Sequence, residues 1–234
     1  MRQAKYDPCA GRIEANLIRK LSAAASIPAF LPFLKKKFLK YKLKKQDWVR
    51  FTDTSFSWIN GQYALGLAAS GSAPALRTLC RYYDKLLLVR KLGIPVFELP
   101  DQTVHAEAML ILYERFGKKR YRPLIREAAE LLKRIAAENG GLVIYWPPEK
   151  EILVDTLGMI ADFCFQSESV FGDKELSAIA AEQLLFTQAH CIDPESGLPC
   201  HAYSLETGCP GGSSTWGRGV GWYLLGLTAR AERD

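Results

Sequence analysis

One short stretch of this chain carries side chains that could bind an anionic sugar. Residues 213–225 read SSTWGRGVGWYLL, in which Arg218 and Trp222 are four positions apart. If the stretch is helical from Trp216, both side chains lie on one face of the helix. A guanidinium binds a carboxylate through two parallel hydrogen bonds, and an indole stacks on a sugar ring. The alternative is a core helix whose glycines let a neighbouring helix approach closely.

Two aspartates stand at the predicted starts of helices. Asp101 follows a proline and precedes the run QTVHAEAMLILYERFG, and Asp155 opens a largely apolar run. Aspartate is a favoured helix N-cap, so each carboxylate could also have a purely structural role. His105, beside Asp101 on the same helix, is predicted to be a packing residue. Asp162, seven residues after Asp155, is either a satisfied buried acid or a residue of the outer rim.

A cluster of cysteines and histidines offers a different kind of chemistry. Four of these five side chains could form a tetrahedral zinc site: His190, Cys191, Cys200, His201 and Cys209. The spacings between these residues match none of the short ligand spacings of common zinc-binding motifs, so a metal site is a minor alternative. His201 taken alone could equally be structural.

The overall charge is concentrated in one segment. The chain has 234 residues and a formal net charge of +6, which would be −1 without seven lysines that fall within eleven residues: Lys35, Lys36, Lys37, Lys40, Lys42, Lys44 and Lys45. A nearly neutral remainder does not favour nucleic-acid binding. The lysine run is expected to be a solvated helix face. A surface that touches anionic lipid or polysaccharide is the alternative.

The N-terminal region indicates neither a secretory signal nor a membrane span. The first twenty residues lack an apolar core, and the apolar run 21–34 is short for a span and contains two prolines. We therefore expect a cytoplasmic protein.

Helices dominate the pattern after residue 50, and strand alternation is scarce. Residues 1–50 are predicted to be a basic lead-in with one or two helices, and residues 51–234 to be one helical domain. Helices are expected at about 57–69, 74–92, 101–116, 122–139, 155–170, 173–190 and 216–232. The first, third, fifth and seventh of these helices are apolar on almost all sides, whereas the second, fourth and sixth each have one polar face. This alternation indicates an α/α toroid or solenoid.

In such a fold the inner helices run in one direction, so their first residues meet at one mouth. This arrangement would bring together two carboxylates, two indoles and a guanidinium: Trp58, Asp101, Asp155, Trp216 and Arg218.

Three segments resemble the unsaturated uronyl hydrolases of glycoside hydrolase families 88 and 105, and their rhamnogalacturonyl group in particular. They are residues 154–159 (VDTLGM), residues 193–198 (DPESGL) followed by His201, and residues 216–222 (WGRGVGW). The resemblance covers about residues 55–234. A departure is that Ile152-Leu153-Val154 precede Asp155 where rhamnogalacturonyl members have a tryptophan.

The resemblance implies an (α/α)6 fold and the removal of a 4,5-unsaturated uronic acid from oligosaccharides made by a lyase, including pectin fragments. The reaction is a hydration of the double bond, with Asp155 as general acid and base and Asp101 as a second carboxylate. His201 and Arg218 would hold the substrate's carboxylate or hydroxyls, while Trp216 and Trp222 would stack on the sugar. No cofactor and no metal are implied.

The resemblance also raises the expectation of a truncated chain. The family's barrel has six helical hairpins, whereas this sequence predicts about seven helices of it. An incomplete toroid would expose an apolar helical edge and favour self-association. The alternatives to an enzyme are therefore an inactive remnant or a structural helical module.

Overall fold

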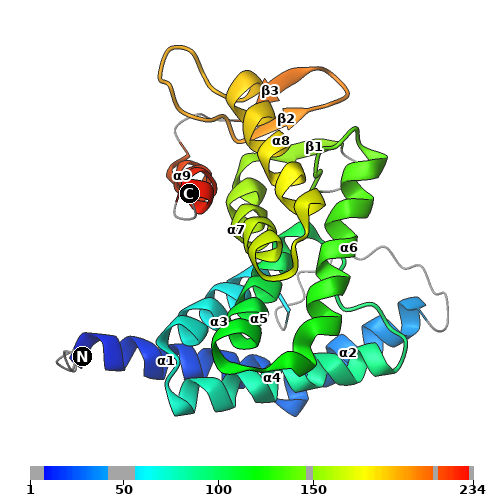
Figure 1. Cartoon of the computed structure of the whole chain (residues 1–234), viewed down its shortest axis with the longest axis vertical. Helices are drawn as coiled ribbons and strands as arrows, with labels where there is room; N and C mark the ends of the chain where they lie inside the picture. Colours follow the sequence, from blue (N-terminus) through cyan, green and yellow to red (C-terminus); the bar gives the residue numbers. More distant parts are fainter. Residues whose placement is uncertain (1–7, 42–55, 146–149, 213–215, 232–234) are drawn as a thin grey trace. The chain divides into compact units, whose positions relative to one another are not determined.

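The computed structural model describes residues 8–41, 56–145, 150–212 and 216–231, and it is mainly helical (Figure 1). Its elements are α1 (Pro8–Ala24), α2 (Ile27–Tyr41), α3 (Trp58–Ser70), α4 (Ala73–Lys91), the short 3-10 helix η1 (Pro100–Gln102), α5 (Thr103–Phe116), the 3-10 helix η2 (Lys119–Tyr121), α6 (Arg122–Glu138), β1 (Glu151–Leu153), α7 (Val154–Phe171), α8 (Lys174–His190), β2 (Ala202–Ser204), β3 (Cys209–Gly211) and α9 (Gly217–Ala231). The prediction of an all-α fold is confirmed. The predicted domain boundary at residue 50 falls outside the described residues and stays a prediction.

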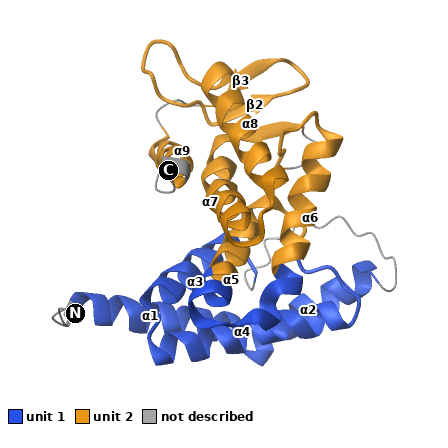
Figure 2. Ribbon diagram, viewed as in Figure 1, with its two compact units in different colours: residues 1–96, 111–124 blue, residues 97–110, 125–234 orange. Residues whose placement is uncertain are grey.

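The chain divides into two compact units (Figure 2). Unit 1 comprises residues 1–96 and 111–124, and unit 2 comprises residues 97–110 and 125–234. Asp101, Asp155, His201 and Arg218 belong to unit 2, so the candidate site is built within one unit.

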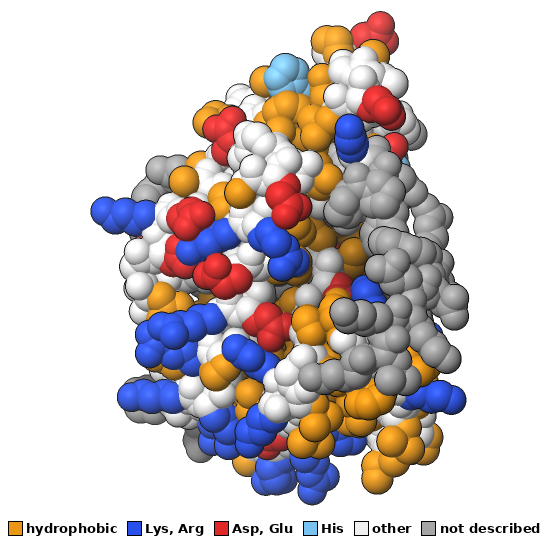
Figure 3. Space-filling model, turned by 90° about the vertical axis from the view of Figure 1, so that its right-hand side faces the viewer, with side chains coloured by type: hydrophobic (Ala, Val, Ile, Leu, Met, Phe, Trp, Pro, Cys, Tyr) orange, Lys and Arg blue, Asp and Glu red, His pale blue; other side chains and the backbone are white. Residues whose placement is uncertain are grey.

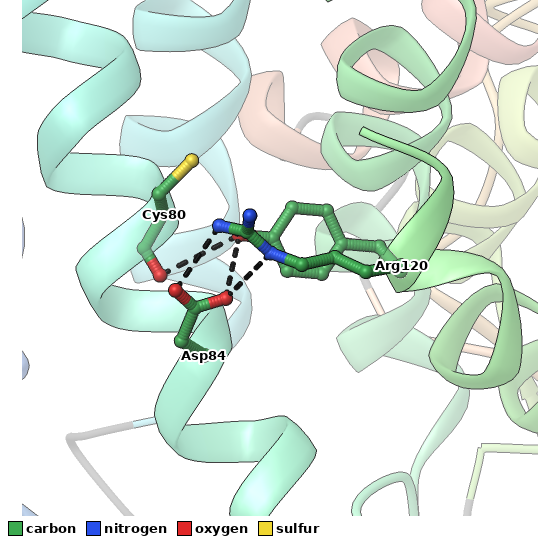
Figure 4. Close-up of polar contacts among 4 residues, drawn as sticks. Cys80, Asp84 and Arg120 are labelled. Atoms are coloured by element: carbon green, nitrogen blue, oxygen red, sulfur yellow. Dashed lines mark hydrogen bonds and ion pairs between the residues drawn. The ribbon is translucent and has the colours of Figure 1, made fainter. Parts of the chain in front are cut away.

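In unit 1, α1 packs against α3 and α4. A polar cluster joins α4 to η2 (Figure 4). Arg120 donates to both carboxylate oxygens of Asp84, at 2.9 and 3.0 Å, and the Tyr121 hydroxyl donates to Asp84 Oδ1 at 3.0 Å. Because the ion pair is half exposed, we attribute only a small stabilisation to it. The fully buried Tyr121 ring anchors the connection.

Helix α7 is the centre of unit 2. It packs against α8, α9, β1 and η1, and Figure 1 shows it between α8 and α9. Its sequence, VDTLGMIADFCFQSESVF, buries side chains on most sides, as its apolar pattern predicted. The helix ends where Gly172 adopts a left-handed conformation with φ of 71°, which glycine reaches without steric cost.

A small antiparallel sheet in the order β1-β2-β3 completes unit 2. The sequence pattern did not predict this sheet, because strands of three residues are too short to show a period of two. Its register pairs Leu153 with Ala202, and Ala202 with Gly211. The sheet therefore ties the segment before α7 to the segment around residue 201.

Among the described residues, no single helix has the length and apolar character needed to cross a membrane. The segments Cys9–Ala24 and Ile27–Tyr41 meet that test only together, as a pair bent by 48°.

Candidate active site

Asp155 is the second residue of α7, and its surroundings are set by the small sheet. The backbone N–H of Val154 donates to the carbonyl oxygen of His201 at 3.1 Å. This bond continues the pairing of Leu153 with Ala202. It satisfies one of the free N–H groups at the start of the helix. Residue 201 is thereby brought beside the start of α7, although 46 positions separate it from Asp155 in the sequence.

Four side chains form a continuous series of contacts that ends at the Asp155 carboxylate. The rings of His201 and Trp216 meet edge to face, with centroids 4.3 Å apart. The guanidinium carbon of Arg218 lies over the indole of Trp216, 4.2 Å from its centroid. Arg218 Nη2 is in turn 4.0 Å from Asp155 Oδ2. The Arg218 side chain is 56% exposed and that of Asp155 only 12%, so a solvent-facing cation lies next to a buried acid.

Asp101 lies in η1, a tight turn that packs against α7. The side-chain oxygen of Gln102 accepts hydrogen bonds from the backbone N–H groups of Glu98 and Leu99, at 2.8 and 3.2 Å. The buried hydroxyl of Thr103 lies 2.6 Å from the Pro100 carbonyl oxygen and 3.3 Å from that of Met159 on α7. These bonds hold Asp101 in a defined place next to the first turns of α7.

The Asp101 carboxylate is buried and only partly satisfied. The hydroxyl of Tyr145 donates to its Oδ2 at 3.1 Å, while its Oδ1 has no hydrogen-bond partner within the described part of the chain. Burial is the main cause that raises the pKa of Asp101 to about 6. The Tyr145 bond opposes this rise and the negative charge of Asp155 adds to it. A buried carboxyl group that holds a proton near neutral pH is typical of catalytic sites.

The pKa of Asp155 is also raised, and burial is again the largest cause. Electrostatic interactions with Arg218 and His201 oppose the rise. The start of a helix also lowers the pKa of an aspartate, through hydrogen bonds from its backbone N–H groups. Arg218 is the largest of the influences that oppose the rise.

The other predicted residues lie in different surroundings. Trp222 is buried, and its ring and carbonyl group pack against Gly158, one helical turn after Asp155. Its stacking on a sugar stays a prediction.

Three further residues named from the sequence are Trp58, His105 and Asp162. Trp58 begins α3 in unit 1, and its place in the site also stays a prediction. His105 is fully buried, as a packing residue would be. Asp162 is half-buried and accepts a hydrogen bond from Gln166 at 3.5 Å.

The described residues do not form the alternative zinc site. No group of three or more His, Cys, Asp or Glu side chains in that part of the chain converges well enough to hold a metal ion. His190 packs instead on the rings of Phe186 and Tyr203, at 4.5 and 5.6 Å. Cys191 is buried, whereas Cys209 is exposed.

Three residues important to this geometry were not among the predicted site residues. One of them is Tyr145, the hydrogen-bond partner of Asp101. Gly158 and Gly226 allow α7 and α9 to approach closely, whereas a Cβ at Gly217 or Gly221 would meet nothing within 4 Å. An isolated glycine inside the apolar α7 pattern was the available signal for such a contact.

We expect the substitution Asp101→Asn to stabilise the protein at neutral pH. Because the pKa rises from 3.8 in the unfolded chain to about 6 in the folded one, the folded state binds more protons between these values. The contribution of this group to the free energy of unfolding therefore falls as the pH rises through 6, by up to about 3 kcal/mol. An asparagine cannot ionise and avoids this loss.

Urea unfolding of the two proteins at pH 4 and pH 7.5 measures the effect. The variant should gain stability over the wild type only at the higher pH. An equal difference at both pH values would contradict the assignment of a buried, proton-binding Asp101.

Comparison with known families gives one match. The family model described as Glycosyl Hydrolase Family 88 matches residues 41–232. A search among curated proteins finds no match.

Several solved structures share the fold. An unsaturated glucuronyl hydrolase from Bacillus sp. GL1, described as responsible for glycosaminoglycan degradation, has a TM-score of 0.62 at 16% identity and covers 76% of this chain and 54% of its own. The corresponding enzyme from Streptococcus agalactiae has a TM-score of 0.62 at 18% identity, with 76% and 50% covered. A family 105 glycoside hydrolase from C. acetobutylicum has a TM-score of 0.54 at 20% identity, with 86% and 59% covered.

These likenesses confirm the predicted fold class of (α/α)6 toroid-type helical hairpins. The chain spans about half the length of the structures that it matches.

Proposed function

Since this chain belongs to Glycosyl Hydrolase Family 88, we propose that it removes a 4,5-unsaturated uronic acid from oligosaccharides produced by a polysaccharide lyase. One observation carries the proposal: the guanidinium of Arg218 lies 4.0 Å from Asp155, a buried acid with a raised pKa. An unsaturated uronic acid bears a carboxylate conjugated to the double bond that must be protonated. The site therefore offers an anchor for the carboxylate next to a proton donor.

In the proposed reaction Arg218 binds the substrate carboxylate, and the sugar ring lies against Trp216. Protonated Asp155 donates its proton to C4. Water adds its oxygen at C5 and returns a proton to the Asp155 carboxylate, so the enzyme ends the step unchanged. The product is a hemiketal at C5, which opens and releases the rest of the saccharide. Because no displacement takes place at the anomeric carbon, the spacing of the two carboxylates does not predict a stereochemical outcome.

Substrate binding would itself help to protonate Asp155. In the free protein Arg218 and His201 favour the charged form of Asp155, while Asp101 has a pKa of about 6. A bound substrate carboxylate would neutralise part of the Arg218 charge and bring a further negative charge close by. Both effects raise the pKa of Asp155. The two aspartates also influence each other, because the negative charge of Asp155 contributes to the raised pKa of Asp101.

The experiment that tests the proposal follows the ultraviolet absorbance of the conjugated double bond. The protein is incubated with unsaturated disaccharides derived from pectin and, separately, from glycosaminoglycan. Loss of absorbance together with release of the second sugar is the expected result. The substrate that is consumed faster decides between the rhamnogalacturonyl and glucuronyl specificities. No turnover of either class would contradict the proposal.

Arg218→Gln should weaken substrate binding by about 1.5–3 kcal/mol, the worth of a hydrogen bond to a charged group. This corresponds to a rise in KM of roughly ten- to 150-fold. The control is the methyl ester of the substrate's carboxylate, which lacks the negative charge. The two proteins should differ little on the ester. An equal loss on acid and ester would mean that Arg218 acts by supporting the site and not by binding the carboxylate.

One observation favours a second candidate function, a structural helical module. Helix α9 exposes three leucine side chains, Leu224, Leu225 and Leu227. An exposed apolar face of this kind favours association with another copy or another protein. If neither sugar is turned over and the chain forms discrete oligomers, the structural candidate is preferred.

A further inference from the structure

Helix α2 is a feature that the proposed function does not use. It reads IPAFLPFLKKKFLKY, and all of it except Tyr41 precedes the range that the family model matches. It contains four of the seven clustered lysines, and the sequence continues with Lys42, Lys44 and Lys45.

One face of α2 packs against the rest of unit 1, to which the helix belongs. The Phe33 side chain is buried, and its ring lies 6.2 Å from the ring of Phe56. Lys37 is buried as well, and its ammonium group donates to the carbonyl oxygen of Val96 at 3.0 Å. Because Phe33 and Lys37 are four residues apart, they define the inward face of the helix.

The outward face carries a stripe of large apolar side chains. Ile27 is 67% exposed, Leu31 54% and Phe38 44%. Spacings of four and seven residues place all three on one side of the helix. Three exposed lysines accompany them on the same helix: Lys35, Lys36 and Lys40. Figure 3 shows Lys and Arg side chains gathered beside hydrophobic ones in the lower part of the face in view.

We propose that α2 docks the protein onto an anionic membrane surface. The stripe formed by Ile27, Leu31 and Phe38 enters the boundary between headgroups and acyl chains. The exposed lysines lie among the anionic headgroups. An interfacial helix needs these two components together, an apolar side and a lysine-rich polar side.

Two other occupants fit the surface less well. A second copy of the chain would bring two lysine-rich helices together, and like charges at close range repel. An acidic polysaccharide would complement the lysines and could stack on Phe38, but Ile27 and Leu31 offer it neither an aromatic ring nor a hydrogen bond. A lipid surface complements both the charge and the apolar side chains.

Flotation of the full chain with lipid vesicles tests the proposal. One set of vesicles is pure phosphatidylcholine, and the other contains about 30% phosphatidylserine. The protein should float with the anionic vesicles only, and less of it should float as the salt concentration rises.

Two variants probe the two components of the surface. The triple substitution K35Q/K36Q/K40Q should weaken binding at least tenfold, because each basic residue near an anionic surface contributes about fivefold. L31S/F38S should weaken it by a similar factor. The matched control, K91Q/K119Q/K174Q, removes the same charge from three exposed lysines outside α2 and should bind like the wild type. Thermal unfolding checks that all variants are folded.

Several results would overturn the proposal. Binding that does not depend on phosphatidylserine, no binding, or an equal effect of the α2 and control lysine variants would each do so. Binding to an anionic polysaccharide that needs the lysines but not Leu31 and Phe38 would assign the surface to that class of ligand. A dimer that L31S/F38S dissociates would assign it to a second copy. None of these results bears on the uronyl hydrolase proposal, whose test uses soluble sugars.

Discussion

Asp155→Asn should lower the turnover of an unsaturated disaccharide by about 10²- to 10⁴-fold, the usual contribution of a general acid or base. Asparagine keeps the shape of the side chain but has no proton to donate to C4 and cannot accept one from water. Because Arg218 and Trp216 remain in place, KM should change little. The expected signature is therefore a loss in kcat with substrate binding retained.

Asp162→Asn is the matched control. Asp162 lies on the same helix two turns later and is half-buried beside Gln166. It has no role in the proposed reaction, so its amide should leave kcat within about twofold of the wild type, as expected for a group outside the reacting site. Both variants are assayed by the loss of double-bond absorbance, with thermal unfolding as the check on folding. If Asp155→Asn keeps more than about a tenth of the wild-type turnover, the assignment of the general acid is wrong.

Gly158→Ala should displace α9 and damage both stability and activity. A Cβ at this position would overlap the carbonyl oxygen of Trp222 and lie 2.8 Å from its carbonyl carbon and 2.9 Å from its ring. Two of these atoms belong to the α9 backbone, so the clash cannot be relieved by a side-chain rotation. Overpacking of a buried contact costs typically 1–3 kcal/mol, and we expect a loss of about 3 kcal/mol in the free energy of unfolding.

Gly158→Ala should also lower the activity of the molecules that remain folded, because α9 carries Arg218. A shift of about 1 Å in a substrate-positioning group can lower the rate by about 10²-fold. Urea unfolding measures the first effect, and kcat/KM, determined where the variant is still folded, measures the second.

Gly221→Ala in α9 provides the contrast. A Cβ there meets nothing within 4 Å, and the residue is helical and exposed. Alanine should stabilise the helix by about 0.5–1 kcal/mol, because it loses less backbone entropy than glycine on folding. If both substitutions lowered the free energy of unfolding equally, the effect of Gly158→Ala could not be attributed to the close approach of α7 and α9 at that residue.

The sequence by itself determined the helices and most of the chemistry-bearing residues. The apolar and amphipathic periods placed the helices from residue 57 onward within a few residues of their observed bounds, because each helix shows enough turns for its pattern to be read. The motif WGRGVGW indicated Arg218 and Trp216 together, because a separation of two residues needs no tertiary information. The resemblance to family 88 is confirmed by the family match.

Only the tertiary structure decided how these residues meet. His201 reaches Asp155 through a three-residue pairing of β1 with β2, which is too short to leave a pattern in the sequence. Tyr145 reaches Asp101 across 44 positions, and no local spacing indicates that bond. Trp222 shares a helix with Arg218 but packs on Gly158, because the side that a helix buries depends on its neighbour. Local periodicity specifies elements, whereas the contacts that raise the pKa of an acid depend on segments that only the folded chain brings together.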